Sequence, residues 1–261
     1  MRIATWNVNS LNARLPRVEE WLDQAKPDVL CLQETKLADD AFPAMTFAGL
    51  GYEAVHHGEG RWNGVAILSR VGIADVVDGF AHGEAFDGAL EGEARLLTAT
   101  CGGVRVVTAY VPNGREVGHE QYFHKLKWFA RLRAHLDAVA DPSTDVLVCG
   151  DFNVAPDDRD VWDPARCNGG THVSAAEREA YAEVCAFGLV DVLRQRYPDE
   201  GLYSWWDYQA GAFHKHWGMR IDLLLASPPL AERLDWVLVD RNGRKGQKPS
   251  DHAPLIAAFS D

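Results

Sequence analysis

Short runs of apolar and β-branched residues recur along the whole chain, and each run ends in polar or turn-forming residues. Runs of this length and composition are typical of β-strands. They predict strands at 2–6, 28–33, 52–56, 64–69, 95–100, 104–111, 144–149, 219–226, 235–240 and 254–259. Several runs, such as 145–149, are apolar at nearly every position, which favours strands that are buried on both faces.

Three segments show the spacing of an amphipathic helix instead. The first has its apolar residues at steps of three, four and one: Leu11, Leu15, Val18, Trp21 and Leu22. The second covers about 119–139 and places the following side chains on one face: Phe123, Leu126, Phe129, Leu132 and Leu136. The third covers about 175–187 and begins with a capping box formed by Ser174 and Glu177.

Many strands, few helices and no regular alternation of the two predict an α/β sandwich, in which two sheets pack together and helices cover them. The chain has no internal repeat, low-complexity tract or linker rich in proline and serine. Its 261 residues exceed the usual length of one domain, but large α/β folds reach this size. We therefore expect a single domain over residues 1–261.

Composition indicates an ordinary globular protein, with 47% hydrophobic and 25% charged residues. No apolar stretch approaches the roughly 18 to 20 residues of a membrane helix, and the N-terminus resembles a strand and not a secretory signal. The cysteines are odd in number, widely spaced and without a CxxC pair, which favours reduced thiols over disulfides or a zinc site: Cys31, Cys101, Cys149, Cys167 and Cys185. We expect a cytoplasmic protein.

The net charge of −12 argues against a protein that grips nucleic acid through a generally basic surface. The local distribution of charge nevertheless leaves room for contact with nucleic acid. Segment 241–248 carries four cations and no anion and directly precedes Ser250, Asp251 and His252. A solvated basic loop is the commoner meaning of such a run. Its position beside a candidate catalytic histidine favours contact with phosphate, and both interpretations stay open.

Polar residues fall at the ends of the predicted strands, or in the apolar run 219–226, and the informative ones are Asn7, Glu34, Tyr110, Asp151, Asn153, Asp222, Asp251 and His252. Each alone has an ordinary explanation as a turn or capping residue. Asp222 is the exception, because a lone acid among apolar neighbours needs a partner. Their common place at the mouths of core strands indicates one shared site.

This set is sufficient for metal-assisted hydrolysis of a phosphate diester. Glu34 offers the hard oxygen ligands that Mg²⁺ prefers. Asp151 is a candidate general base for the attacking water, and His252 a donor to the phosphate. Asp222 is expected to fix the tautomer and orientation of His252. Neutral donors for phosphate oxygens come from Asn7, Tyr110 and Asn153.

Six blocks, in order along the chain, carry a resemblance to a known family: 5–14, 27–36, 109–114, 150–156, 220–227 and 250–254. They include Leu-Gln-Glu-Thr-Lys at 32–36, Gly-Asp-Phe-Asn at 150–153 and Ser-Asp-His at 250–252. With these blocks the chain resembles the exonuclease III family of apurinic/apyrimidinic (AP) endonucleases, within the endonuclease/exonuclease/phosphatase superfamily. One block alone would be a weak signal, and six in the right order are a strong one.

The resemblance implies a four-layer α/β sandwich, with two mixed β-sheets packed face to face, helices outside and the site at one edge. It implies Mg²⁺, with Mn²⁺ as a possible substitute, held by Glu34 with Asn7 and Asp251 near the ion. It also implies catalytic roles for Tyr110, Asp151, Asn153, Asp222 and His252. Asn9 stands where some members carry Asp, so the choice between one and two metal ions stays open.

The implied partner is double-stranded DNA with abasic sites, nicks or 3′ ends, cut 5′ to the lesion or trimmed from its 3′ ends by a monomeric enzyme. Trp205, Met219 and Ile221 match an apolar pocket for the flipped abasic sugar, although some relatives carry Trp at the position of Met219. Trp206 is as well explained by a core position. Loops that touch the DNA backbone in relatives match Arg14, Asn113 and Arg115.

Two alternatives remain at this point. A superfamily phosphatase acting on inositol phosphates or sphingomyelin would use the same acids, but the blocks at 9–14 and 32–36 favour the DNA enzymes. A catalytically silent DNA-binding relative would have lost one or more of the acids, and here all are present. The loops expected over the pocket, 162–172 and 207–217, should set the balance between incision, exonuclease and 3′-phosphatase activity.

Overall fold

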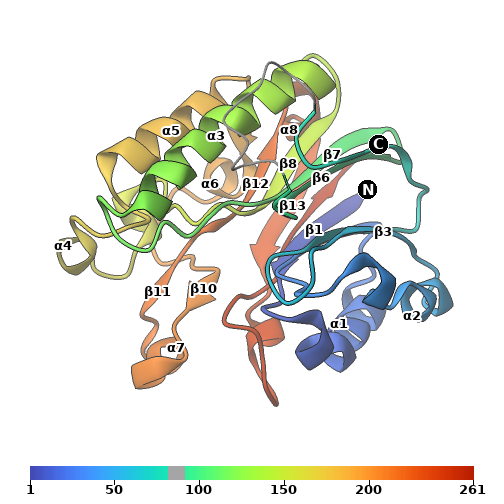
Figure 1. Cartoon of the computed structure of the whole chain (residues 1–261), viewed down its shortest axis with the longest axis horizontal. Helices are drawn as coiled ribbons and strands as arrows, with labels where there is room; N and C mark the ends of the chain where they lie inside the picture. The colour runs from blue at the N-terminus through green and yellow to red at the C-terminus, as the bar shows by residue number, and fades with distance from the viewer. Residues whose placement is uncertain (82–91) are drawn as a thin grey trace.

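The structure is a computed structural model that describes residues 1–81 and 92–261. Two six-stranded sheets form its centre (Figure 1). The first has the order β13 (Leu234–Val239), β14 (Leu255–Phe259), β1 (Arg2–Asn7), β2 (Val29–Gln33), β4 (Val65–Ser69), β3 (Glu53–His57). The second has the order β5 (Ala74–Asp78), β6 (Leu96–Cys101), β7 (Val104–Tyr110), β8 (Val146–Asp151), β12 (Asp222–Ala226), β9 (Val190–Asp191). A small ribbon pairs β10 (Trp205–Trp206) with β11 (Gly218–Met219).

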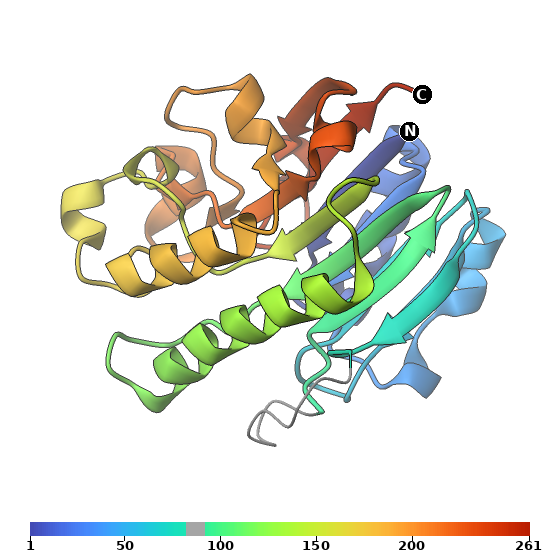
Figure 2. The same cartoon turned by 90° about the horizontal axis from the view of Figure 1, so that it is seen from above.

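Both sheets are mixed. The pairs β1–β2 and β7–β8 are parallel, and the other pairs in the two sheets are antiparallel. Helices α1 (Leu11–Ala25) and α2 (Ala44–Gly49) lie on the outer side of the first sheet, and α3 (Glu120–Val139) and α5 (Ala175–Cys185) on the outer side of the second. Figures 1 and 2 show the two helical layers on opposite sides of the sheets. The expected four-layer sandwich is therefore confirmed.

The burial of successive strand residues explains why so many runs are apolar throughout. In β2, Val29 and Cys31 join the core between the two sheets, whereas Leu30 and Leu32 pack under α1 and α2. Strand β8 repeats this arrangement, since Leu147 faces the inter-sheet core while its neighbours face α3 and α5. Because successive strand side chains point to opposite faces, a sheet covered on both sides needs apolar residues at every position.

The three predicted helices are present, and the capping box of α5 forms between Ser174 and Glu177. One detail of the second was wrong, because Phe123 is 54% exposed. The first turns of α3 direct Tyr122 and Lys125 inward instead. The shorter helices within the described residues were not predicted: α2, α4 (Pro164–Cys167), α6 (Val192–Arg196), α7 (Ala212–Lys215), α8 (Pro228–Ala231), η1 (Asp39–Ala41), η2 (Asp158–Asp160), η3 (Gln209–Gly211) and η4 (Arg241–Arg244).

The predicted strand 219–226 was wrong as a single element. It is divided, since Met219 belongs to the β10–β11 ribbon and β12 begins only at Asp222. The interruption follows from Arg220, a buried side chain that binds Asp160 with Nε at 2.7 Å and Asp191 with Nη1 at 2.6 Å. These carboxylates hold the guanidinium at the junction between ribbon and sheet. Strand β5, at a sheet edge, and the two-residue β9 were not predicted.

All five cysteines are free thiols, as their spacing led us to expect. Among the helices of the described ranges, no helix is both long and apolar enough to span a membrane.

Candidate active site

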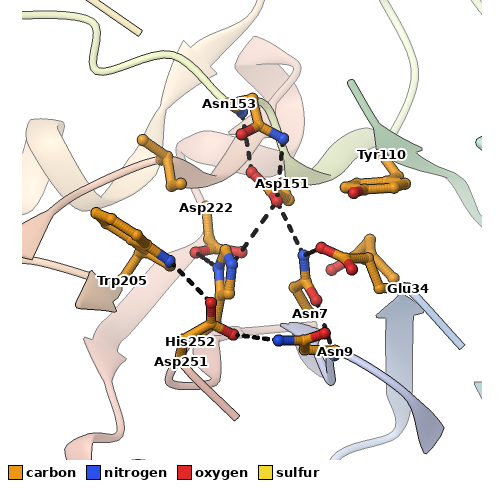
Figure 3. A network of polar contacts seen from close by, with 12 residues as sticks. Asn7, Asn9, Glu34, Tyr110, Asp151, Asn153, Trp205, Asp222, Asp251 and His252 are labelled. Atoms are coloured by element: carbon orange, nitrogen blue, oxygen red, sulfur yellow. Dashed lines mark hydrogen bonds and ion pairs between the residues drawn. The ribbon is translucent and has the colours of Figure 1, made fainter. Parts of the chain in front are cut away.

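Adjacent strands bring three of the predicted residues to one level of the second sheet. Tyr110 at the end of β7 is the register partner of Asp151 at the end of β8, and Asp151 is the partner of Asp222 at the start of β12. In the first sheet, β1 ends at Asn7 and β2 leads directly into Glu34. Figure 3 shows that the residues from both sheets meet in one network.

Asn7 links the two principal acids across the gap between the sheets. Its buried amide nitrogen donates to Glu34 Oε1 and to Asp151 Oδ2, both at 2.9 Å. Its amide oxygen accepts from the backbone N–H of Asn9 at 2.9 Å, which fixes the orientation of the amide. The other oxygen of Glu34, Oε2, lies 2.9 Å from Lys36 Nζ. The two carboxylates are therefore held at a fixed separation by a neutral donor.

His252 lies between the carboxylates of Asp222 and Asp151. Its Nδ1 is 2.7 Å from Asp222 Oδ2, and its Nε2 is 3.8 Å from Asp151 Oδ2. Burial alone would lower the pKa of His252, but the negative charges of Asp222 and Asp151 outweigh burial and raise this pKa to about 10. The imidazole is therefore charged at neutral pH, with a proton on each ring nitrogen. Nδ1 donates to Asp222, and the N–H of Nε2 is available to a ligand.

Asp151 is almost completely buried, at 1% exposure. Burial raises its pKa to about 7, with the charges of Asp222 and Glu34 adding to this rise and His252 opposing it. Asn153 supports the carboxylate from a left-handed backbone conformation, with φ of +49°. Its backbone N–H donates to Asp151 Oδ1 at 2.9 Å and its side-chain amide to Oδ2 at 3.2 Å. A carboxyl group with a pKa near 7 is suited to proton transfer at neutral pH.

Tyr110 borders the same network. Burial raises the pKa of its hydroxyl well above the ordinary value, and the negative charge of Glu34 adds to that rise. The guanidinium of Arg95 lies over the ring, 4.6 Å from its centroid. The phenol therefore stays protonated and is a neutral donor at the edge of the site.

Glu34, Asp151 and His252 each offer an atom within 4.8 Å of the others, a spacing that suits a bound metal ion. The chemistry of the three side chains indicates which of them can bind the ion and which kind of ion fits. His252 is occupied by Asp222 and is protonated, so it is unsuited to bind a cation. The remaining oxygens of Glu34 and Asp151 fit a hard divalent cation, which commonly uses one or two carboxylates and keeps several waters.

Asp251 occupies the side of the network next to Asn9 and Trp205. Its Oδ1 accepts from Asn9 Nδ2 and its Oδ2 from Trp205 Nε1, both at 3.1 Å. Lys36 Nζ in turn donates to Asn9 Oδ1 at 2.6 Å. Asn9 thus connects Asp251 to the Lys36–Glu34 ion pair. The roles of Asn7 and Asp251 as metal ligands stay predictions.

The three predicted pocket residues pack in one apolar cluster. Trp205, Met219 and Ile221 gather with Ala155 and Val161, and Trp205 pairs with His252 through an isolated β-bridge. The cluster therefore adjoins His252. Trp206 joins a different cluster that is fully buried, which agrees with opposite orientations for the two neighbouring tryptophans.

The loops 162–172 and 207–217 contact each other and the site. Trp162 stacks on Trp217 with ring centroids 4.9 Å apart. At the end of the first loop, His172 contacts the backbone oxygen of Asn153 through Nδ1 and lies 3.4 Å from Asn113 Nδ2 through Nε2. Burial lowers the pKa of His172 to about 4, so the imidazole is neutral. The first loop thus reaches the backbone of the segment that carries Asp151 and Asn153.

The predicted DNA contacts lie around this network. Arg14 donates to the backbone oxygen of Asn9 at 2.6 Å and to the hydroxyl of Tyr208 at 2.9 Å. The side-chain amide of Asn113 donates to Asn153 Oδ1 at 3.2 Å. Arg115 is exposed on the following loop with φ of +59°. Arg14 and Asn113 therefore border the site, whereas Arg115 faces solvent.

Lys125 was overlooked in the sequence. It is fully buried, and its Nζ lies 2.5 Å from both the backbone oxygen of Asn153 and Glu177 Oε1. A lysine on the buried face of a predicted amphipathic helix was the available signal, since lysine is rarely buried without a partner. The side chain ties α3 and α5 to the segment that carries Asn153.

Comparison with known proteins agrees with this geometry. Residues 4–252 match the model of the endonuclease/exonuclease/phosphatase family. Exodeoxyribonuclease III of Haemophilus influenzae is 35% identical, over 99% of this chain and all of its own length. An AP endonuclease structure from Archaeoglobus fulgidus superposes with a TM-score of 0.95 at 40% identity, and a 3′ phosphatase structure from Neisseria, bound to a product DNA hairpin, with 0.94 at 38%; both cover each chain completely.

The coverage is complete in both directions, so the likeness is not confined to the catalytic core. The resemblance read from the six sequence blocks is therefore confirmed. The chain belongs to the endonuclease/exonuclease/phosphatase family, and within it to the exonuclease III nucleases.

Proposed function

We propose that this protein is a magnesium-dependent DNA repair phosphodiesterase that cuts DNA on the 5′ side of abasic sites and acts on the 3′ ends of duplex DNA, as a 3′-5′ exonuclease and 3′-phosphatase. The observation that carries the proposal is the position of Asp151. Its buried carboxylate is joined to Glu34 through Asn7 and faces the charged imidazole of His252. This arrangement combines a metal-binding acid, a proton acceptor and a cationic donor in one pocket.

We assign Mg²⁺ to the oxygens of Glu34, with Asn7 and Asp251 as neighbours and Mn²⁺ as a substitute. When bound, the ion would polarise a phosphoryl oxygen and offset charge on the leaving oxygen. The donor set supports a hard cation, because the groups free to bind are carboxylate oxygens.

Asp151 is the proposed general base. The oxygen of water bonds to phosphorus, a proton passes from the water to Asp151, and the bond from phosphorus to O3′ breaks. Asn153 donates twice to Asp151, so the carboxylate is held in one orientation for this transfer. The released O3′ takes up a proton from solvent water and becomes a 3′ hydroxyl, and Asp151 gives its proton back to solvent.

His252 supplies positive charge to the phosphate. Asp222 fixes its Nδ1 and leaves Nε2 on the side of Asp151, where it would donate to a phosphoryl oxygen. The hydroxyl of Tyr110 is a further neutral donor on the other side of Asp151 (Figure 3). Charge developing on the phosphate would thus meet donors that are already in place.

Selectivity for abasic sites would come from the cluster of Trp205, Met219 and Ile221 beside His252. A sugar without its base can enter a small apolar space at a lower unstacking cost than an intact nucleotide. The family relatives support this assignment, since they include an AP endonuclease and a 3′ phosphatase bound to DNA. We further infer a monomer that works in the cytoplasm, in keeping with its free cysteines.

The test is a time course on three labelled duplexes, carrying an abasic site, a recessed 3′ end or a 3′ phosphate. Each is run with Mg²⁺, with Mn²⁺ and with a chelator, and inositol phosphates serve as the comparison substrate. We expect cutting of the DNA substrates that stops in chelator and returns with added Mg²⁺. Turnover of inositol phosphates with no turnover of DNA would contradict the proposal.

A further inference from the structure

A second cavity lies beside the active site, between loop 207–214 and the basic segment 241–248. Its volume is about 390 Å³, which is in the range of sites for small ligands. The lining includes Tyr208, Phe213, His214, Arg244 and Lys245. In Figure 1, the β10–β11 ribbon with α7 and the segment before β14 project from the same end of the molecule.

Arg244 is the informative residue of this cavity. It is only 7% exposed, yet no carboxylate of the described residues forms an ion pair with it. One of its terminal nitrogens makes a long hydrogen bond of 3.4 Å to the backbone oxygen of Trp206, and within the described ranges its Nε has no partner. Asp251 acts on Arg244 only through space, and a buried cation without an ion pair is costly unless an anion completes it.

Aromatic rings hold this guanidinium in place. It lies 5.0 Å from the ring centroid of Tyr208 and 5.3 Å from that of Phe213. The guanidinium of Arg241 lies 5.0 Å from the ring centroid of Phe213 and 5.4 Å from that of Trp206. Arginine on aromatic faces with free N–H groups is a common arrangement for recognising phosphate.

The remaining charges of the cavity agree with an anionic ligand. Lys245 lines the cavity and is exposed, and among the described residues its Nζ has one hydrogen-bond partner, the neutral side chain of Asn242 at 2.9 Å. Asp207 is the acid of the lining, and its carboxylate accepts from the backbone N–H of Gln209 at 2.7 Å. The cavity therefore has an excess of positive charge in a protein whose net charge is −12.

Arg14 connects this cavity to the active site. Its guanidinium donates to the backbone oxygen of Asn9 and to the hydroxyl of Tyr208, which itself donates to the backbone oxygen of Pro249. Asn9 is bonded to Asp251. A DNA strand bound in the active site would thus have a cationic cavity next to it, on the side of Asp251.

We propose that the cavity between loop 207–214 and segment 241–248 binds a backbone phosphate of the DNA, separate from the phosphate that is cut, through Arg244 and Lys245. This inference rests on the proposed function and gives it a second anchoring point. The basic segment is then neither a solvated loop nor part of the catalytic machinery. It holds the strand while the reaction occurs elsewhere.

The test compares Lys245→Gln and Arg244→Gln with wild type and with Arg196→Gln, a control at an exposed arginine that does not line the cavity. DNA affinity is measured by fluorescence anisotropy in chelator at several salt concentrations, and kcat and KM in Mg²⁺. Losing one phosphate contact should reduce the slope of log K against log salt by about 0.9 and weaken binding about fivefold, with kcat unchanged. If Arg244→Gln does not fold, the test rests on Lys245→Gln, because Lys245 is exposed and its replacement should not affect folding.

Deoxythymidine 5′-monophosphate and inorganic phosphate are added as competitors in a second arm. Competition by the mononucleotide together with unchanged salt slopes in both variants would mean a site for free nucleotide and would overturn the proposal. Slopes equal to that of the Arg196→Gln control would overturn it too, while leaving the proposed function intact if wild type cuts DNA. A wild-type protein that neither binds nor cuts DNA would overturn both.

Discussion

Asp222 and Asp151 are register partners on adjacent antiparallel strands, and the imidazole of His252 lies against both carboxylates. The two acids differ in their contacts. Asp222 holds Nδ1 at 2.7 Å, whereas Asp151 is 3.8 Å from Nε2 and is bound by Asn7 and Asn153. One sheet therefore supplies both the acid that orients the histidine and the acid that is free to take a proton.

The first prediction concerns Asp222. Replacement by Asn keeps the size of the side chain but removes the charge that holds the imidazolium, so the pKa of His252 should fall. We expect the single-turnover rate of DNA incision to fall on the order of 100-fold. NMR titration of His252 and quenched-flow kinetics measure the two effects. Asp235→Asn, at an exposed acid of β13, is the control. An unchanged rate in Asp222→Asn would show that Asp222 does not position the histidine.

The second prediction concerns Lys125. Replacing it with Met leaves the carboxylate of Glu177 buried without its cation, which should reduce the free energy of unfolding by about 3–5 kcal/mol. The double change Lys125→Met/Glu177→Gln should recover more than half of this loss. Urea denaturation measures both, with Arg196→Met at an exposed position of α6 as control. A loss below about 1 kcal/mol in Lys125→Met would contradict the buried ion pair.

The third prediction concerns Trp205. Trp205→Phe keeps an aromatic wall in the apolar cluster and loses the hydrogen bond to Asp251, whereas Trp205→Ala opens the cluster. We expect the Phe variant to keep its preference for abasic over recessed duplexes. In the Ala variant, the ratio of the two kcat/KM values should fall about tenfold. Ratios of kcat/KM on the two substrates measure the preference, with Trp236→Ala on β13 as control. If wild type and Trp205→Ala showed the same preference for the abasic duplex, Trp205 would not be part of the pocket for the abasic sugar.

The fourth prediction concerns His135 and pH. Burial lowers its pKa to about 4, and the nearby charges of Arg105 and Arg131 add to the effect. Its Nδ1 accepts from the backbone N–H of Ala81 at 2.9 Å, which requires the neutral ring, and Nε2 lies 2.9 Å from Thr98 Oγ1. The unfolded chain binds a proton below about pH 6.5, while the folded chain resists it down to about pH 4. Neutral His135 therefore stabilises the fold fully above pH 6.5, and this stabilisation is lost as the pH falls toward 4.

At low pH, the contribution of His135 to the free energy of unfolding should fall by about 3 kcal/mol. Denaturation in urea at pH 7.5 and at pH 4.5 measures it, by comparing wild type with His135→Gln. The glutamine amide can accept from Ala81 and donate to Thr98 without titrating, so the variant should lose less stability on acidification. Parallel losses in the two proteins would show that His135 is not the residue responsible.

Much of the fold followed from the sequence because burial on both faces leaves a plain pattern. The runs that became β2 and β8 are apolar throughout and were predicted within two residues of their ends. Strand β5 was missed, since it is an exposed edge strand that carries two acids, Asp75 and Asp78, and lacks that pattern. The run at 219–226 was wrongly predicted as one strand. The partners of Arg220, Asp160 and Asp191, are far away in the sequence, so the break at Arg220 could not be foreseen from the run itself.

The acids of the candidate site were predictable for the same reason. Glu34, Asp151 and Asp222 are polar residues at the ends of apolar strands, so their meeting at the same end of the two packed sheets follows from the topology. The contacts that cross between loops and helices did not follow. Lys125 and His172 both reach the backbone oxygen of Asn153, and nothing in their own segments identifies that oxygen as the partner.

The most direct measurement of the central claim is single-turnover incision of an abasic duplex by Asp151→Asn, paired with its affinity for the same DNA in chelator. The amide keeps the hydrogen-bonding shape of the site and removes the proton acceptor. We predict a rate at least 10³-fold below wild type with a dissociation constant within a few-fold of it. A variant that binds DNA and still cuts at the wild-type rate would contradict the assignment of Asp151 as the general base.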